Sequence, residues 1–91
     1  MNEELSERVL KAIHQAGGDT IPPTLGRDDS LVLRLGFDSM KLALLSLSLE
    51  SEFGCEIALD VWIGAHPDPR QLTVGSLNDY VESAVRRSGS T

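Results

Sequence analysis

The sequence predicts an all-α fold built on three longer helices. Three segments, at about 2–16, 39–53 and 73–87, carry apolar residues three and four positions apart, which is the period of an amphipathic helix. No segment of useful length alternates apolar and polar residues as a half-buried strand does. With 91 residues, the chain suffices for one small domain, which we place at 1–87 with a flexible tail at 88–91.

The first helix, at about 2–16, has acidic residues near its positive N-terminal end and is expected to stop at Gly17-Gly18. The chain from there to Phe37 reads as a long loop, because Pro22-Pro23 stiffen the backbone and turn-forming residues follow. Loops of this length are unusual in small domains. We expect apolar side chains to attach the loop to the core, with a short turn at 31–35. A functional loop is the other interpretation.

The second helix, at about 39–53, is apolar on two sides and is expected to end at Gly54 in a left-handed cap conformation. One side, which includes Leu45 and Leu49, is assigned to the core. The opposite side carries Met40, Leu44 and Leu47. A helix with two apolar sides is either fully buried or offers the second side to a partner. The alternative is that the long loop covers this second side.

The rest of the chain contains shorter elements. The segment at 58–65, which includes Trp62, is either a short helix or an irregular apolar segment. Asp68 is expected to cap one helical turn begun by Pro69. Thr73 is expected to cap the final helix.

Charge and cysteine content exclude several classes of function. The net charge is −6 and Arg86-Arg87 form the only basic cluster, so the electrostatic footprint of nucleic-acid binding is missing. The single cysteine, Cys55, allows no internal disulfide, and with the distant His14 and His66 it forms no zinc spacing. No apolar run approaches a membrane span and no N-terminal signal is visible. We expect a cytoplasmic monomer with no metal site and no nucleic-acid or membrane partner.

The most informative feature is the run Gly36-Phe37-Asp38-Ser39-Met40, which places a serine hydroxyl at the start of a helix. A phosphate ester there would lie beside the unpaired N–H groups and the positive end of the helix dipole. Asp-Ser before a helix is also a common cap, since either side chain accepts a hydrogen bond from those N–H groups. Ser39 therefore has two interpretations, a modification site and a helix cap.

The order of these elements, together with four short motifs, resembles the acyl and peptidyl carrier protein family. The motifs are Leu35-Gly36-Phe37-Asp38-Ser39-Met40, Leu49-Glu50-Ser51-Glu52-Phe53-Gly54, Glu56-Ile57 and Leu72-Thr73-Val74-Gly75-Ser76-Leu77. Each motif alone is weak, but their order and spacing together indicate the family over nearly the whole chain. The resemblance implies a four-helix carrier bundle with a short third helix and a long loop between the first two helices.

By this resemblance, Ser39 is the hydroxyl to which a phosphopantetheinyl transferase attaches the 4′-phosphopantetheine of coenzyme A. Acyl cargo would be held as a thioester on the thiol of this arm. Asp38 is implied to help hold the magnesium ion of the transferase during modification, besides capping the helix. The carrier itself does no chemistry, so no catalytic residue is expected. The other implied partners are an adenylating ligase or acyltransferase for loading and a downstream synthase, condensing or tailoring enzyme.

The resemblance also bears on the subtype of carrier. Carriers of bacterial fatty-acid synthesis tend to have acidic residues where this chain has Lys41 and Leu44. This difference favours polyketide, nonribosomal peptide or siderophore assembly, with Met40, Lys41, Leu44 and Leu47 as the partner face. The long stretch at 57–74 looks similar to stand-alone aryl carriers of siderophore pathways.

Two rival functions remain for comparison. A serine hydrolase needs a histidine against its serine and an acid behind it, and neither His14 nor His66 stands in such a motif. A chain of this size also leaves little room for a substrate pocket. The second rival is a helical protein-interaction module, in which Ser39 is only a helix cap and the apolar side of the second helix binds a partner helix.

Overall fold

The computed structural model describes residues 3–18, 21–22 and 24–89, and this part of the chain is all-α. Its helices are α1 (Glu3–Gly17), α2 (Ser39–Phe53), α3 (Leu59–Ala65) and α4 (Val74–Gly89), with one 3-10 turn, η2 (Pro69–Gln71). Among these residues the only β-type pairing is an isolated bridge between Ser30 and Thr73. The predicted bundle with a long loop between its first two helices is confirmed.

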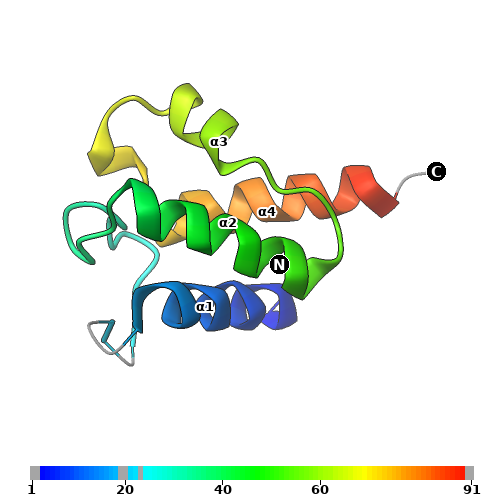
Figure 1. Ribbon diagram of the computed structural model, residues 1–91, viewed down its shortest axis with the longest axis horizontal. Helices are drawn as coiled ribbons and strands as arrows, with labels where there is room; N and C mark the ends of the chain where they lie inside the picture. Colours follow the sequence, from blue (N-terminus) through cyan, green and yellow to red (C-terminus); the bar gives the residue numbers. More distant parts are fainter. Residues whose placement is uncertain (1–2, 19–20, 23, 90–91) are drawn as a thin grey trace.

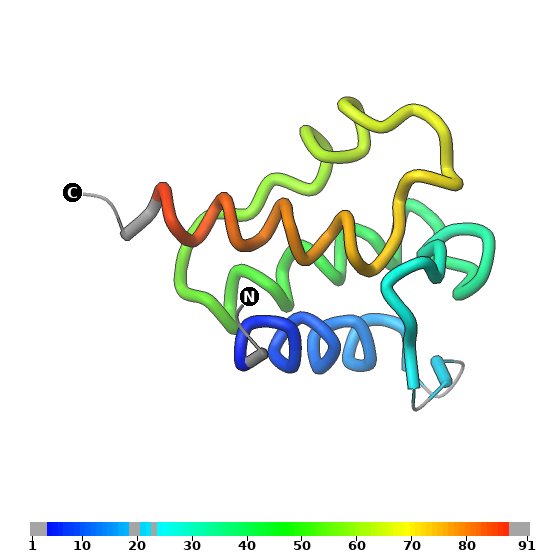
Figure 2. The backbone as a smooth tube through the Cα atoms, turned by 180° about the vertical axis from the view of Figure 1, so that it is seen from behind, coloured from blue at the N-terminus to red at the C-terminus, as the bar shows by residue number. Residues whose placement is uncertain are grey.

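The helices surround one apolar core. In Figure 1, α2 and α4 lie between α1 on one side and α3 on the other, and the view from behind in Figure 2 shows the same order. Apolar side chains from all four helices are fully buried, among them Val9, Ile13, Leu45, Leu49, Leu59, Trp62, Leu77 and Val81. Burial of one such side chain contributes about 1.5–3 kcal/mol to folding. No helix in the described ranges has the length and apolar character needed to cross a bilayer.

The end of α1 is shaped by close packing with the loop that follows. The helix continues through Gly17, one residue beyond the predicted end. A Cβ atom at Gly17 would overlap the side chain of Ile21 and lie 3.2 Å from the ring of Phe37. Only glycine lets these two buried side chains approach the helix so closely. Asn2, the predicted first residue of this helix, lies outside the described residues.

The C-terminal end of α2 is tied to α1 by Arg8. Its Nη2 donates a hydrogen bond of 2.7 Å to the backbone oxygen of Glu52, and its Nε lies 3.2 Å from the Glu52 carboxylate. The guanidinium carbon also lies 4.9 Å from the centre of the Phe53 ring, a cation–π distance. Gly54 then ends α2 in the left-handed conformation predicted for it, with φ at 67°.

The long loop is held against the segment that leads into α4. The N–H of Leu31 donates to the backbone oxygen of Leu72 at 2.8 Å, and the N–H of Val74 donates to that of Asp29 at 3.0 Å. In Figure 2 the cyan part of the loop runs near the segment that leads into α4. The predicted turn at 31–35 is confirmed by the N–H of Leu35, which donates to the oxygen of Ser30 at 3.1 Å. The loop is therefore a fixed part of the fold.

Ser30 anchors this loop, and its removal should lower stability. The side chain is buried, its Oγ donates to the backbone oxygen of Pro69 at 2.8 Å and it accepts from the N–H of Leu33 at 3.1 Å. Because Ser30→Ala leaves two polar partners without this group, we expect a loss of about 1–3 kcal/mol in the free energy of unfolding. Urea titration followed by circular dichroism measures this. Ser83→Ala, at an exposed position on α4, is the control, and an equal effect of both variants would contradict the anchoring role.

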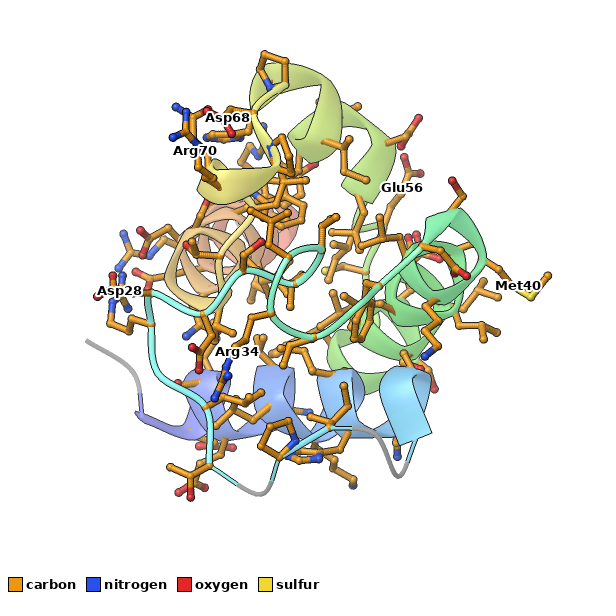
Figure 3. The ribbon with its side chains drawn as sticks, turned by 90° about the vertical axis from the view of Figure 1, so that its left-hand side faces the viewer. Asp28, Arg34, Met40, Glu56, Asp68 and Arg70 are labelled. Carbon is orange, nitrogen blue, oxygen red and sulfur yellow. The ribbon has the colours of Figure 1, made fainter. Side chains whose placement is uncertain are left out.

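The segment between α2 and α4 settles the alternatives that the sequence left open. The stretch at 58–65 forms the short helix α3 and is not irregular. Asp68 caps η2 as predicted, accepting from the N–H of Arg70 at 2.9 Å. Hydrogen bonds from the Arg70 side chain to the Asp68 carboxylate hold the pKa of that carboxyl below its ordinary value (Figure 3). Thr73 caps α4 as predicted, since its Oγ1 accepts from the N–H of Ser76 at 3.1 Å.

The predicted start of the tail differs from the structure. Residue 88 was expected to begin the flexible tail at 88–91, but α4 continues to Gly89. The physical reason is that serine opposes a helix only weakly, so Gly89 is the first residue in this region that disfavours helix strongly. Ser90 and Thr91 lie outside the described residues.

Candidate functional site

The start of α2 separates the roles of Asp38 and Ser39. Asp38 has an extended backbone, with φ at −107° and ψ at −175°, and its Oδ1 accepts from the N–H of Lys41 at 2.9 Å. Asp38 is therefore the N-cap. Ser39 is the first helical residue, is exposed, and its hydroxyl makes no hydrogen bond within the described part of the chain. The interpretation of Ser39 as only a helix cap is wrong, and its hydroxyl is left free to react.

The residues before Ser39 fix its position at the surface. Leu35 and Phe37 are buried on either side of Gly36. Gly36 adopts a left-handed φ of 71°, which residues other than glycine rarely tolerate. The N–H of Phe37 donates to the backbone oxygen of Leu31 at 2.9 Å, which ties this turn to the anchored loop. Because the chain is held by these buried neighbours, Asp38 and Ser39 lie together at the start of α2, facing solvent.

The electrostatic surroundings of Ser39 suit a phosphate ester. The positive end of the α2 dipole lies at this residue, and an anionic group there is stabilised by about 0.3–1 kcal/mol when exposed. In the ranges that the structure describes, no three potential ligands gather to hold a metal ion. A magnesium ion bound by Asp38 would therefore take its remaining ligands from another molecule, as Mg²⁺ commonly does with substrate phosphates.

An open groove of about 520 Å³ between α2 and α3 contains Ser39 in its wall. Its lining residues are Ser39, Leu42, Ala43, Ser46, Leu47, Leu59, Asp60 and Ile63. Most of these side chains are aliphatic. Its volume falls within the range of ordinary small-molecule sites, about 300–1,000 Å³. The groove can thus accept a small apolar group that is attached near the start of α2.

The groove exists because α3 is held by α4. Trp62 is almost fully buried and its Nε1–H donates to the Oγ of Ser76 at 3.1 Å. The hydroxyl of Tyr80 donates to the backbone oxygen of Ala58 at 2.9 Å, at the start of α3. These two bonds attach α3 to α4, so the side of α3 that faces α2 is left to line the groove. The sequence did not reveal these roles of Ser76 and Tyr80, because each partner lies outside α4.

The second apolar side of α2 is exposed. Met40, Leu44 and Leu47 are 73%, 47% and 64% exposed, so the alternative in which the long loop covers them is wrong. Figure 3 shows Met40 projecting away from the body of the protein. Lys41 is half-buried beside them. Val61 of α3 is also exposed.

The two histidines and the cysteine do not line the groove that contains Ser39. His66 follows α3, and its Nδ1 lies 3.0 Å from the backbone oxygen of Trp62. His14 lies in α1. Cys55 is partly buried and packs against the core. None of them is a candidate base for Ser39.

Comparison with protein families gives one finding. The family model described as "phosphopantetheine attachment site" matches residues 7–73 of the 91. The matched range includes the loop, α2 and all the lining residues of the groove. Comparisons with curated proteins and with solved structures gave no significant match.

Proposed function

Since the chain belongs to the family defined by a phosphopantetheine attachment site, we propose that Ser39 is the residue that carries the group. A member of this family is a carrier protein with covalently attached 4′-phosphopantetheine. The observation that supports Ser39 is its exposed hydroxyl at the first position of α2, without a hydrogen-bond partner in the described ranges. When bound, the group supplies a thiol on which acyl cargo is held as a thioester.

The residues around Ser39 fit this group. Asp38 already caps the helix, so the Ser39 oxygen can be esterified without loss of a structural hydrogen bond. We propose that Asp38 also helps to hold the magnesium ion of the transferase, because its carboxylate is exposed beside the hydroxyl to be modified. The apolar groove that begins at Ser39 offers a surface to the flexible arm or to its cargo.

Within this family we propose a carrier for secondary-metabolite assembly, of the polyketide, nonribosomal peptide or siderophore type. The support is the partner face formed by Met40, Lys41, Leu44 and Leu47. Its three apolar side chains are exposed, and Lys41 and Leu44 stand where fatty-acid carriers tend to be acidic. Carrier domains of this family are generally not catalytic themselves, and we assign the chemistry to the partner enzymes. The lone cysteine suits a reducing cytoplasm.

The proposed partners follow from this role. A phosphopantetheinyl transferase modifies Ser39, and an adenylating ligase or acyltransferase loads the thiol. A synthase, condensing or tailoring enzyme then uses the cargo. The aryl-carrier subtype and the monomeric state stay predictions. Mass spectrometry after incubation with coenzyme A, magnesium and a promiscuous transferase tests the function, because a carrier gains one phosphopantetheine group and a mere interaction module gains none.

The role of the partner face can be tested with the transferase, since this enzyme must approach Ser39. Leu44→Glu places a carboxylate in the centre of the face, and its desolvation against an apolar partner costs about 1–3 kcal/mol. We expect kcat/KM for modification to fall by a factor of about 5 to 100, mainly through KM. Steady-state assays with fluorescent coenzyme A measure it.

Leu33→Glu is the matched control for this change. Leu33 is 62% exposed but lies in the long loop, outside the partner face. We expect its kcat/KM to stay within about twofold of the parent, as for an ordinary surface substitution. Equal losses in both variants would contradict the assignment of the face to α2.

A further inference from the structure

Three of the residues that line the groove are polar, namely Ser39, Ser46 and Asp60. Ser39 is the proposed attachment residue, and the Oγ of Ser46 donates to the backbone oxygen of Ile57 at 2.8 Å, so its proton is committed. The remaining polar lining residue is Asp60, in the first turn of α3. The wall of the groove therefore combines aliphatic side chains with one carboxylate.

The Asp60 carboxylate has no partner inside the protein. Its side chain makes no ion pair and no hydrogen bond within 3–18, 21–22 and 24–89. The acidic residues in ion pairs there are Asp29, Glu52, Asp68, Asp79 and Glu82. Asp60 is exposed, so its carboxylate can be approached from the groove that it lines. A cationic group that entered the groove would find an unpaired countercharge there.

The arm attached at Ser39 can bring its cargo to this carboxylate. The α2 wall of the groove runs from Ser39 to Leu47, a rise of ~12 Å. An extended phosphopantetheine arm is longer than this span, so an arm that folds back along α2 and bends within the groove can hold the thioester between the two walls. Asp60 and Ile63 form the facing wall on α3.

We propose that the groove selects cargo that bears a positively charged amine on a short apolar body, as in an aminoacyl thioester. The inference rests on the proposed carrier function and names the cargo class of the same site. The aliphatic wall contacts the body of the cargo, and Asp60 pairs with the ammonium group. A cargo with a free carboxylate, such as a dicarboxylic acid held through its other carboxyl group, is disfavoured because it meets the like charge of Asp60.

The experiment compares two cargoes of equal length on the same carrier. A promiscuous transferase installs β-alanyl-phosphopantetheine or butyryl-phosphopantetheine, which differ by an ammonium group in place of a methyl group. Intact mass first establishes that each loaded form is present. The rate of thioester cleavage by hydroxylamine then reports how well the groove shelters the cargo. Each variant is compared with the parent for the same cargo, so the intrinsic reactivity of the thioester cancels.

We expect Asp60→Asn to speed cleavage of the β-alanyl form by a factor of about two to five, the range of a partly exposed ion pair, and to leave the butyryl form unchanged. Asp28→Asn removes the same charge from an exposed loop residue outside the groove and should change neither rate. Equal acceleration of both cargoes, or none, overturns the inference. Failure of the transferase to load Ser39 at all would overturn the proposed function instead, and mass spectrometry shows that before any rate is measured.

Discussion

Ser39→Ala is expected to abolish phosphopantetheine modification completely. Alanine lacks the oxygen that forms the phosphoester, so the loss is chemical and does not depend on a change in fold. The Ser39 hydroxyl makes no hydrogen bond in the described part of the chain, and the cap belongs to Asp38. Alanine is also a good helix former, so the free energy of unfolding should change by less than about 0.5 kcal/mol.

Ser51→Ala provides the matched control for this prediction. Ser51 is an exposed serine of the same helix, at its other end. Under conditions in which the parent and Ser51→Ala are fully modified, intact mass should show no added group on Ser39→Ala. Thermal unfolding by circular dichroism verifies that all three proteins are folded. A phosphopantetheine adduct on Ser39→Ala would place the attachment residue elsewhere.

Trp62→Ala is expected to cause the largest loss of stability. Trp62 is 1% exposed and is the largest of the fully buried side chains in the described ranges. Its removal leaves a cavity between α3 and α4 and deletes the hydrogen bond to Ser76. Buried aromatic residues replaced by alanine cost about 3–5 kcal/mol, which is a large share of the stability of a domain of this size. Because the chain has one tryptophan, urea titration must be followed by circular dichroism and not by fluorescence.

Two companion variants separate the contributions at this position. Trp62→Phe keeps an aromatic ring but loses the N–H donor and part of the ring volume, and should cost about 1–2 kcal/mol. Val61→Ala changes the neighbouring, 60% exposed residue of the same helix and should cost less than about 0.5 kcal/mol. If Trp62→Ala were no more destabilising than Val61→Ala, α3 would not be held by Trp62 and the groove would lack its proposed support.

The sequence predicted the long helices because their apolar period is a local signal. Leu45 and Leu49, four residues apart, were assigned to the core side of α2 and are fully buried. The segment at 58–65 has only about two turns, too few for a period to distinguish a helix from an irregular apolar run. Its helical state depends on burial of Leu59 and Trp62 in the core, which sequence spacing alone does not show.

Contacts between distant residues account for most of what the sequence did not reveal. The sequence indicated only a turn at Ser30, yet its Oγ donates a hydrogen bond to the backbone oxygen of Pro69, 39 positions away. Arg8 stands in no motif of the sequence, yet it binds the end of α2, 44 positions away. The groove also depends on contacts between distant residues, since two hydrogen bonds attach α3 to α4. Local patterns carry no information about such pairings.

The sequence proposed which residues form the candidate site, but it did not give their geometry. The motif around Asp38-Ser39 resembled a carrier, and the family match agrees with that resemblance. The same two residues also suited a helix cap, because both side chains accept hydrogen bonds. Only the geometry shows that Asp38 caps the helix and that Ser39 is left with an exposed, unbonded hydroxyl.

The most direct test of the account is site mapping of the modification on the parent protein. The protein is incubated with coenzyme A, magnesium and a promiscuous transferase, and intact mass and peptide fragmentation are then recorded. A proven carrier, modified in parallel, shows that the transferase is active. We predict a gain of one phosphopantetheine group, located on Ser39. No gain under these conditions, or a group on any other residue, would contradict the account.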